Sequence, residues 1–198
     1  PFEIPKGWQR FRAADWGYSS PACCLWFAID YDNNLWVYRE LYTQKITADI
    51  FARKVLDLES GEYIRYGVLD ASTWARRGDI GPSIAETMIQ AGCRWRPSDR
   101  TGRSRISGKL EIHKRLKVED KEPGIRIFSN CRNLLRTFPT LPLDDSNPED
   151  INTHVEDHAY DALRYGCTSR PMHTSYANKL YGSRNTSEFV PSDRVFGY

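Results

Sequence analysis

Three aspartates at the ends of expected secondary-structure elements are the residues best suited to chemistry in this chain. Asp15 ends an expected strand over residues 10–15, Asp70 follows one over residues 63–69, and Asp161 lies on the last expected helix. A single aspartate at a strand end is usually a turn residue, but three in this order indicate a divalent-metal site. Mg²⁺ favours carboxylate oxygens and keeps several waters. Two ions about 3.5–4 Å apart can activate a water and stabilise the leaving oxygen of a phosphodiester.

The last expected helix, over residues 154–166, carries a second aspartate on the face of Asp161. Asp157 and Asp161 are four residues apart, so they lie one above the other, away from the apolar stripe of the helix. Two stacked carboxylates repel each other at neutral pH unless a cation lies between them or water surrounds them. The helix alone therefore fits either a metal site or a solvated acidic face beside Arg164.

The charge of the chain is unevenly distributed, although its net value is only +2. Residues 94–117 carry nine Lys and Arg against Asp99 and Glu111, a net of +7, whereas residues 118–162 carry ten Asp and Glu against four Lys and Arg, a net of −6. A basic segment followed by an acidic one suits a protein that holds both a polyanion and a metal ion.

Length and composition predict one globular domain with a hydrophobic core. The 198 residues are 40% hydrophobic and 27% charged, and no stretch approaches the roughly 18–20 apolar residues of a membrane span. The five cysteines are odd in number and include no C-x-x-C pair, which favours reduced, buried thiols in a cytosolic protein over disulfides or a zinc site. Because the chain begins at Pro1 and not at Met, we expect it to be a fragment of a longer protein.

The elements that must position the aspartates follow from hydrophobic patterning. Three antiparallel strands are expected first, then alternating strands and helices, which predicts a mixed α/β sheet with helices on both faces. In such a sheet the first and fourth strands can be neighbours, which would place Asp15 beside Asp70, and a helix crossing that edge would add Asp161. The expected strands cover residues 10–15, 22–29, 35–42, 63–69, 93–95 and 125–128, and the expected helices cover 47–61, 83–91, 103–117, 130–135 and 154–166.

The basic helix over residues 103–117 is expected to bury Ile106, Leu110 and His113, which recur at helical spacing. Gly108 inside it costs about 1 kcal/mol relative to alanine. His158 lies between the two aspartates of the last helix in sequence but is expected to point elsewhere.

Three short motifs give the chain a resemblance to a known family. The order Ala14-Asp15-Trp16-Gly17, then Val68-Leu69-Asp70, then the run from Asp157 to Tyr165 resembles the nuclease domain of the large terminase subunit of tailed bacteriophages. The last motif is the most specific, and the resemblance covers roughly residues 8–170. It implies an RNase H-like fold and metal-dependent cutting of double-stranded DNA during viral genome packaging, in the host cytoplasm at the procapsid portal.

The resemblance also implies roles for individual residues. Asp15 would bridge two divalent ions, Mg²⁺ or Mn²⁺, Asp70 would hold one ion and Asp161 the other, and Asp157 would be an alternative ligand or support the ligands from behind. Phosphate contacts, which position DNA without reading bases, are expected from a set of basic residues: Arg76, Arg77, Arg103, Arg105, Lys109, Lys114 and Arg115.

Family members carry an ATPase motor domain upstream and act with a portal protein and a small terminase subunit. No G-x-x-x-x-G-K-[ST] loop occurs here, so the chain is expected to be the isolated nuclease half. Residues 1–9 would then be a lead-in or linker from the motor, residues 10–170 the nuclease domain, and residues 171–198 a polar tail.

Two other interpretations remain open. Another RNase H-like enzyme, such as a resolvase or a transposase-type strand transferase, would use a similar acidic triad and differ in a strand-transfer assay. A non-catalytic module that docks DNA or the portal would use the acids for structure and would show no metal-dependent cleavage.

Overall fold

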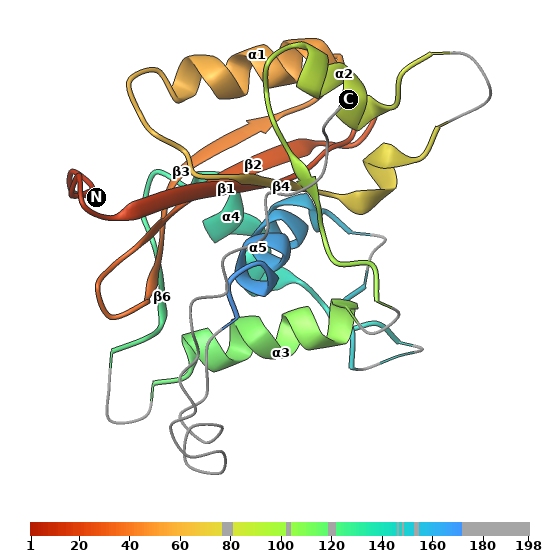
Figure 1. The fold of residues 1–198 in the computed structure, drawn as a ribbon. Coiled ribbons are helices and arrows are strands. Elements are labelled where there is room, and N and C mark those ends of the chain that lie inside the picture. Colours follow the sequence, from red (N-terminus) through yellow and green to blue (C-terminus); the bar gives the residue numbers. More distant parts are fainter. Residues whose placement is uncertain are drawn as a thin grey trace, which may run out of the picture.

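A six-stranded mixed sheet forms the centre of the protein (Figure 1). The computed structural model describes residues 1–76, 81–101, 104–118, 122–145, 147, 149–152 and 155–171. Arg77, Arg103, His154 and the predicted tail beyond residue 171 lie outside these residues. In the part that is described, no helix is long and apolar enough to cross a membrane.

The sheet has the strand order β5-β4-β1-β2-β3-β6. Its first three strands are antiparallel neighbours, and β4, β5 and β6 join in parallel. The predicted mixed sheet and the predicted pairing of the first and fourth strands are therefore confirmed. The strands are β1 Gln9–Asp15, β2 Ala22–Ile29, β3 Leu35–Thr43, β4 Gly67–Leu69, β5 Arg96–Pro97 and β6 Ile125–Ile127.

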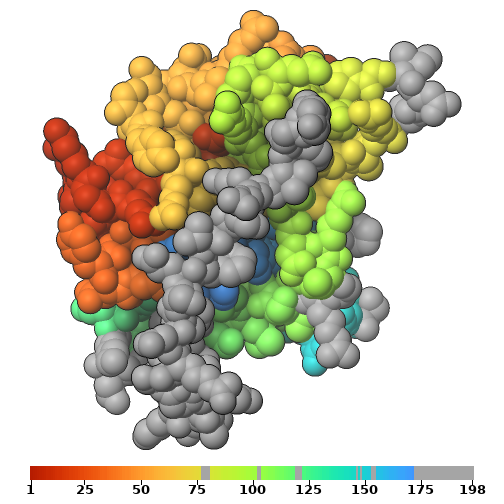
Figure 2. Space-filling model, in the orientation of Figure 1, coloured from red at the N-terminus to blue at the C-terminus, as the bar shows by residue number. Residues whose placement is uncertain are grey.

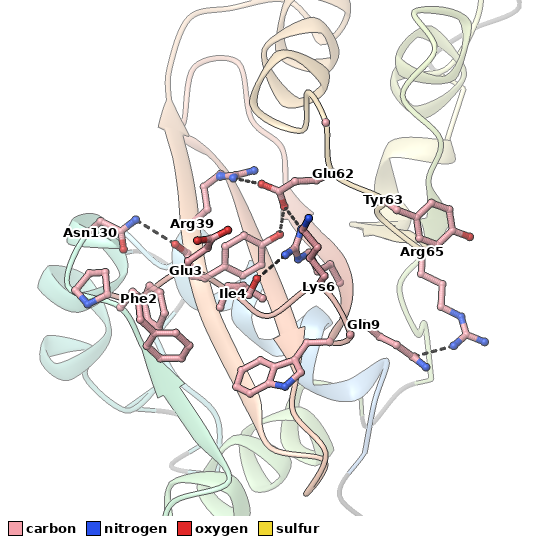
Figure 3. Close-up of a pocket in the computed structure, with 17 residues that line it drawn as sticks. Phe2, Glu3, Ile4, Lys6, Gln9, Arg39, Glu62, Tyr63, Arg65 and Asn130 are labelled. Atoms are coloured by element: carbon pink, nitrogen blue, oxygen red, sulfur yellow. Dashed lines mark hydrogen bonds and ion pairs between the residues drawn. The ribbon is translucent and has the colours of Figure 1, made fainter.

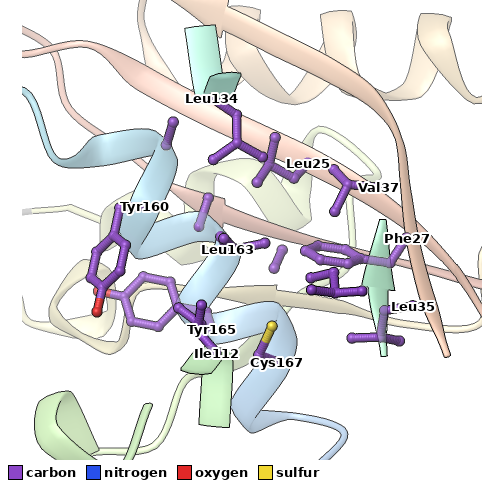
Figure 4. Close-up of a cluster of buried hydrophobic side chains, with 14 of the residues drawn as sticks. Leu25, Phe27, Leu35, Val37, Ile112, Leu134, Tyr160, Leu163, Tyr165 and Cys167 are labelled. Carbon is purple, nitrogen blue, oxygen red and sulfur yellow. The ribbon is translucent and has the colours of Figure 1, made fainter. Parts of the chain in front are cut away.

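Helices cover both faces of the sheet, as predicted (Figure 1). One core lies between the sheet and the helices α1 and α2, and the other lies between the sheet and α3, α4 and α5 (Figure 4). Every residue of β2 is buried because this apolar strand contributes to both cores. The helices are α1 Ala48–Leu58, α2 Ile84–Gln90, α3 Ser104–Leu116, α4 Arg132–Thr137 and α5 His158–Thr168.

The position of α5 decides where its aspartates lie. A Cβ atom on Gly166 would come 2.3 Å from the ring of Phe27, so the glycine lets α5 lie directly on β2. The helix begins at His158 and not near residue 154 as predicted. Asp157 is its N-cap residue, although its side chain makes no capping hydrogen bond.

The boundaries of two strands differ from those predicted. The fourth strand is only Gly67–Leu69, although the backbone of Arg65 and Tyr66 already hydrogen-bonds to β1 and the side chains of Tyr63 and Arg65 are exposed. The fifth is Arg96–Pro97 and not 93–95, because the buried Trp95 ring packs against Gly67, where a Cβ atom would lie 2.7 Å from it.

Two helices also differ in detail. Asn130 does not cap α4, since its amide donates to the carbonyl of Tyr38, and the carboxylate of Glu40 accepts the amides of Asn133 and Leu134 instead. The predicted buried stripe of α3 is wrong: Leu110 is 54% exposed and His113 is exposed. The buried residues of that helix are Gly108, Glu111, Ile112 and Arg115.

Candidate active site

Two neighbouring strand ends bring Asp15 and Asp70 together. Asp15 is the last residue of β1, and Asp70 directly follows β4, which is parallel to β1. The backbone N–H of Asp70 donates to the carbonyl of Ala14 at 3.1 Å, so the two aspartates lie at the same edge of the sheet. Side chains that the sequence separates by 55 positions are thus fixed next to each other by the sheet itself.

The helix α5 contacts both aspartates. Nδ1 of His158 lies 2.9 Å from Oδ2 of Asp15, and the hydroxyl of Tyr165 donates to Oδ1 of Asp70 at 3.3 Å. The expectation that His158 points elsewhere is therefore wrong. The beginning of the helix is seated at the first strand end, and Tyr165, two turns later, reaches the second.

Asp161 lies buried on the same helix and is held by two arginines. Arg164 donates to Oδ1 of Asp161 through Nε at 3.0 Å and lies within 2.9 Å of the same oxygen through Nη2. Arg105 of α3 approaches Oδ2 more loosely, at 3.5 Å, while its Nε donates to Asp150 at 2.8 Å. Oδ1 is therefore firmly engaged, and Oδ2 has only one long contact among the described residues.

Electrostatics link the four carboxyl groups into one cluster. Burial raises the pKa of Asp15 to about 6; the hydrogen bond from His158 opposes this, and the charges of Asp161 and Asp70 add to it. Burial and the charge of Asp161 likewise raise the pKa of Asp157 to about 6. The bond to Asp15 raises the pKa of His158. The site concentrates negative charge that a cation would relieve.

The carboxylates of this cluster are of the type that hard divalent cations bind, but their side chains are not yet arranged around one metal position. Across the described residues, no three His, Cys, Asp or Glu side chains already converge on one metal position. Oδ2 of Asp15 is engaged by His158 and Oδ1 of Asp161 by Arg164. Mg²⁺ and Mn²⁺ nevertheless take carboxylate oxygens. The negative charges of neighbouring aspartates contribute, after burial, to the raised pKa values of Asp15 and Asp157. To hold a metal ion, the side chains of Asp15, Asp70 and Asp161 would have to rotate away from these contacts.

The predicted DNA contacts are distributed differently from the expectation. Arg115 is fully buried, lies 3.1 Å from Glu111 and donates to the carbonyl of Gly124, so it cannot reach a DNA backbone at the surface. Arg105 faces the acids, and Lys109 donates to the carbonyl of Glu149.

The two remaining predicted contacts that the structure describes lie at the surface, but in different settings. Lys114 is exposed on α3. Arg76 is also exposed and pairs with Glu86, at the N-terminal end of α2. The buried Arg115 beside the exposed Lys114 shows that the predicted basic helix is not one continuous basic face.

A large hollow lies away from the aspartates (Figure 3). It has a volume of about 970 Å³ and is lined by residues 1–4 and 6–10 at the start of β1, whereas Asp15 ends that strand. Three of its charged residues pair with one another: Glu62 contacts Arg39 and, at 3.4 Å, Arg10. Size alone would therefore point to the wrong end of the sheet.

The roles of three residues near the site were not foreseen from the sequence. Arg164 was expected only beside a solvated acidic face, His158 was expected to point elsewhere, and Tyr165 was only part of a motif. The contacts of His158 and Tyr165 with Asp15 and Asp70 emerge from the packing of α5 on the strand ends. Their clustering with Asp161 on one short helix is the only signal that the sequence carried.

No protein-family model matches the sequence, and no curated protein matches it. Solved structures do: the nuclease domain of the phage P22 large terminase is 18% identical, with 86% of this chain and 85% of that chain covered and a TM-score of 0.65. This chain has the fold of a large terminase nuclease domain. The predicted RNase H-like architecture is thereby confirmed.

Two further terminases share this fold. The large terminase nuclease of the thermophilic phage G20c with bound cobalt is 14% identical over 82% of this chain and 81% of that chain, with a TM-score of 0.56. The same nuclease has also been solved with bound zinc. The large terminase of a second thermophilic bacteriophage is 12% identical over 84% of this chain with a TM-score of 0.64, and this chain spans 41% of its length.

Proposed function

We propose that this protein is a divalent-metal-dependent endonuclease that cleaves double-stranded DNA during viral genome packaging. One observation carries the proposal: on a terminase nuclease fold, Asp15 and Asp70 occupy adjacent strand ends, and α5 brings Asp161 into the same electrostatic cluster. The metal ions bound to the nuclease of phage G20c, cobalt and zinc, support the assignment of a metal site to this fold.

Asp15, Asp70 and Asp161 would hold two ions, Mg²⁺ or Mn²⁺, with Asp15 shared between them and Asp157 as an alternative ligand. When bound, the ions supply activation of a water and stabilisation of charge on the departing oxygen. The chain itself contributes positioning. Tyr165 orients Asp70 through its hydroxyl, and Arg164 fixes Oδ1 of Asp161, which leaves Oδ2 directed to a further partner.

The remaining predicted features belong to the same proposal. The upstream partner would be an ATPase motor domain of the same polypeptide, joined through residues 1–9, and the assembly would act with a portal protein and a small terminase subunit in the host cytoplasm. This chain spans 41% of the large terminase of the second thermophilic phage, which supports a nuclease that forms one part of a longer protein. DNA contacts from Arg76, Arg77, Arg103 and Lys114 stay predictions.

The decisive experiment is incubation of the protein with supercoiled plasmid in EDTA, Mg²⁺ and Mn²⁺. We expect nicking and linearisation only with metal, and loss of both in Asp70→Asn and Asp161→Asn variants that remain folded. Asp57→Asn is the matched control, because Asp57 is an exposed aspartate on α1, on the other face of the sheet. Cleavage that survives both site substitutions would overturn the assignment, and DNA binding without cleavage by the wild type would favour a docking module.

A further inference from the structure

Two hollows meet at the β5 edge of the sheet and share one arginine. The first, of about 540 Å³, is lined by residues that include Arg65, Arg94 and Arg96. The second, of about 330 Å³, is lined by residues that include Arg96, Ser98 and Tyr165. We call the pair the β5 groove. The yellow-green segment 81–101, which forms part of its lining, lies at the surface of the face drawn in Figure 2.

The β5 groove leads to the candidate active site. In the parallel pairing of β4 and β5, Val68 is the partner of Arg96, and the backbone N–H of Ser98 then donates to the carbonyl of Leu69 at 2.8 Å. The chain therefore runs alongside β4 up to Asp70. At this end the groove is lined by Tyr165, whose hydroxyl donates to Asp70.

Cations along this edge face solvent without acidic partners. Arg94, Arg96 and Arg100 are exposed, and none of them has a carboxylate partner within the described parts of the chain. Arg96 lies over the ring of Tyr66 at 3.8 Å, which restrains its position. Arg100 lines neither hollow, but it follows the groove residue Asp99 and donates to the carbonyl of Ala71, the residue after Asp70.

Acidic residues in the groove are already neutralised or engaged. Glu59 forms an ion pair with Arg12 at 2.6 Å, and Glu62 pairs with Arg39. Asp99 accepts the backbone N–H and the hydroxyl of Thr101, both at 3.0 Å. These neutral donors leave the charge of Asp99 in place, so the exposed Arg94 and Arg96 outnumber the one groove carboxylate that has no ion pair among the described residues.

The basic segment 94–117 thus divides into two parts with different roles. On α3, Arg105 pairs with acids and Arg115 is buried. Before α3, the arginines of the β5 groove stay at the surface. Backbone phosphates supply most of the sequence-independent attraction of DNA for proteins. The exposed arginines at the sheet edge offer more charge to such phosphates than the exposed Lys114 of α3 does.

We propose that duplex DNA enters the candidate active site along the β5 groove, with Arg94, Arg96 and Arg100 contacting its phosphates. The inference rests on the proposed nuclease function and adds the surface that guides the substrate. Contacts of this kind position DNA without reading its sequence, which suits cutting at many sites. None of these three arginines was among the contacts predicted from the sequence.

The test is the salt dependence of duplex binding in EDTA, where cleavage cannot occur. Binding is measured by the fluorescence anisotropy of a labelled duplex. Each lost phosphate contact lowers the slope of log K against log salt by about 0.9. We expect about this change in each of Arg94→Gln, Arg96→Gln and Arg100→Gln, and a change of about 2.7 in the triple variant if the contacts are independent. Arg53→Gln, an exposed arginine on α1, is the control and keeps the wild-type slope.

Parallel plasmid cleavage with Mn²⁺ separates the two proposals. If the wild type cleaves and the triple variant keeps the wild-type slope, the proposed DNA path along the β5 groove is refuted and the nuclease function still stands. A wild type that neither binds duplex DNA nor cleaves it would overturn both. If Lys114→Gln lowers the slope as much as the triple variant does, the DNA contacts lie on α3 and the proposed path along the β5 groove is refuted.

Discussion

Substitution of Gly108 by alanine tests how closely α3 and α5 approach. A Cβ atom at this position would lie 2.4 Å from Cγ and 2.8 Å from Cδ of Arg164. Arg164 has little room to retreat, since it is 4% exposed and its guanidinium is held by Asp161. The glycine is therefore required by the crossing of the two helices, in spite of its cost to α3.

Two opposing effects set the magnitude. Alanine in a helix interior is favoured over glycine by about 1 kcal/mol. Overpacking of a tight contact costs about 1–3 kcal/mol. We expect Gly108→Ala to lower the free energy of unfolding by about 0–2 kcal/mol. Ser107→Ala, at the exposed neighbouring position of α3, gains helix propensity and loses an exposed hydrogen bond of 3.3 Å to the carbonyl of Ser104, so it should be close to neutral.

The assay combines urea unfolding with a Mn²⁺ titration. If Arg164 is displaced, Asp161 loses the group that fixes its Oδ1, and groups that orient metal ligands in this way typically contribute about 10–100-fold to metal affinity or activity. We therefore expect Gly108→Ala to need about 10-fold more Mn²⁺ or higher for half-maximal cleavage. Stabilisation by about 1 kcal/mol, with an unchanged metal requirement, would refute the reasoning, because it would show that only the glycine penalty matters.

Three further predictions concern charge and metal. Arg115→Gln should destabilise the protein by about 3–5 kcal/mol, because it breaks the buried ion pair with Glu111. Urea unfolding beside the exposed Lys114→Gln, expected within about 0.5 kcal/mol of wild type, checks this, and equal effects would contradict it. The pKa of Asp15 is about 6 in the folded protein against an ordinary 3.8, so the folded state binds this proton more tightly than the unfolded state does. The metal-free free energy of unfolding should therefore fall as the pH rises from about 4 to about 6, by at most about 3 kcal/mol from this group. Unfolding in EDTA across that range measures the slope, and Asp15→Asn should flatten it; a stability that rises with pH would be the wrong sign. Mn²⁺ at about 100 times its Kd should stabilise the wild type by about 2.7 kcal/mol, and Asp161→Asn should abolish most of the gain in a thermal melt; an equal gain in both proteins would place the metal elsewhere.

Several features were readable from the sequence because they depend on local patterns. The continuous apolar run of residues 22–29 predicts a strand buried on both faces, and β2 is such a strand. Ser83 and Glu86 form the capping box that their spacing predicts at the start of α2. Asp15 and Asp70 stand at the ends of neighbouring strands as expected, since the strand periodicity and the alternation of elements limit how such a sheet can be built.

Helix faces were predicted less well, because a helix buries whatever side its neighbour covers. In α3 the hydrophobic spacing of Ile106, Leu110 and His113 suggested one face, but the helix turns another toward α5. The buried face includes Gly108, which admits Arg164, and Arg115, which is neutralised by Glu111. Hydropathy counts a charged residue as exposed and cannot reveal a partner that removes its charge from solvent.

The sequence by itself determined the order of the strands along the chain and the presence of carboxylates at their ends. Only the tertiary structure decided that His158 contacts Asp15, that Arg164 engages one oxygen of Asp161, and that exposed arginines lie at the β5 edge. The physical reason is range. Strand patterns and caps are set by residues a few positions apart, whereas the charge, burial and partners of a site depend on groups that meet only when α5 packs across the sheet.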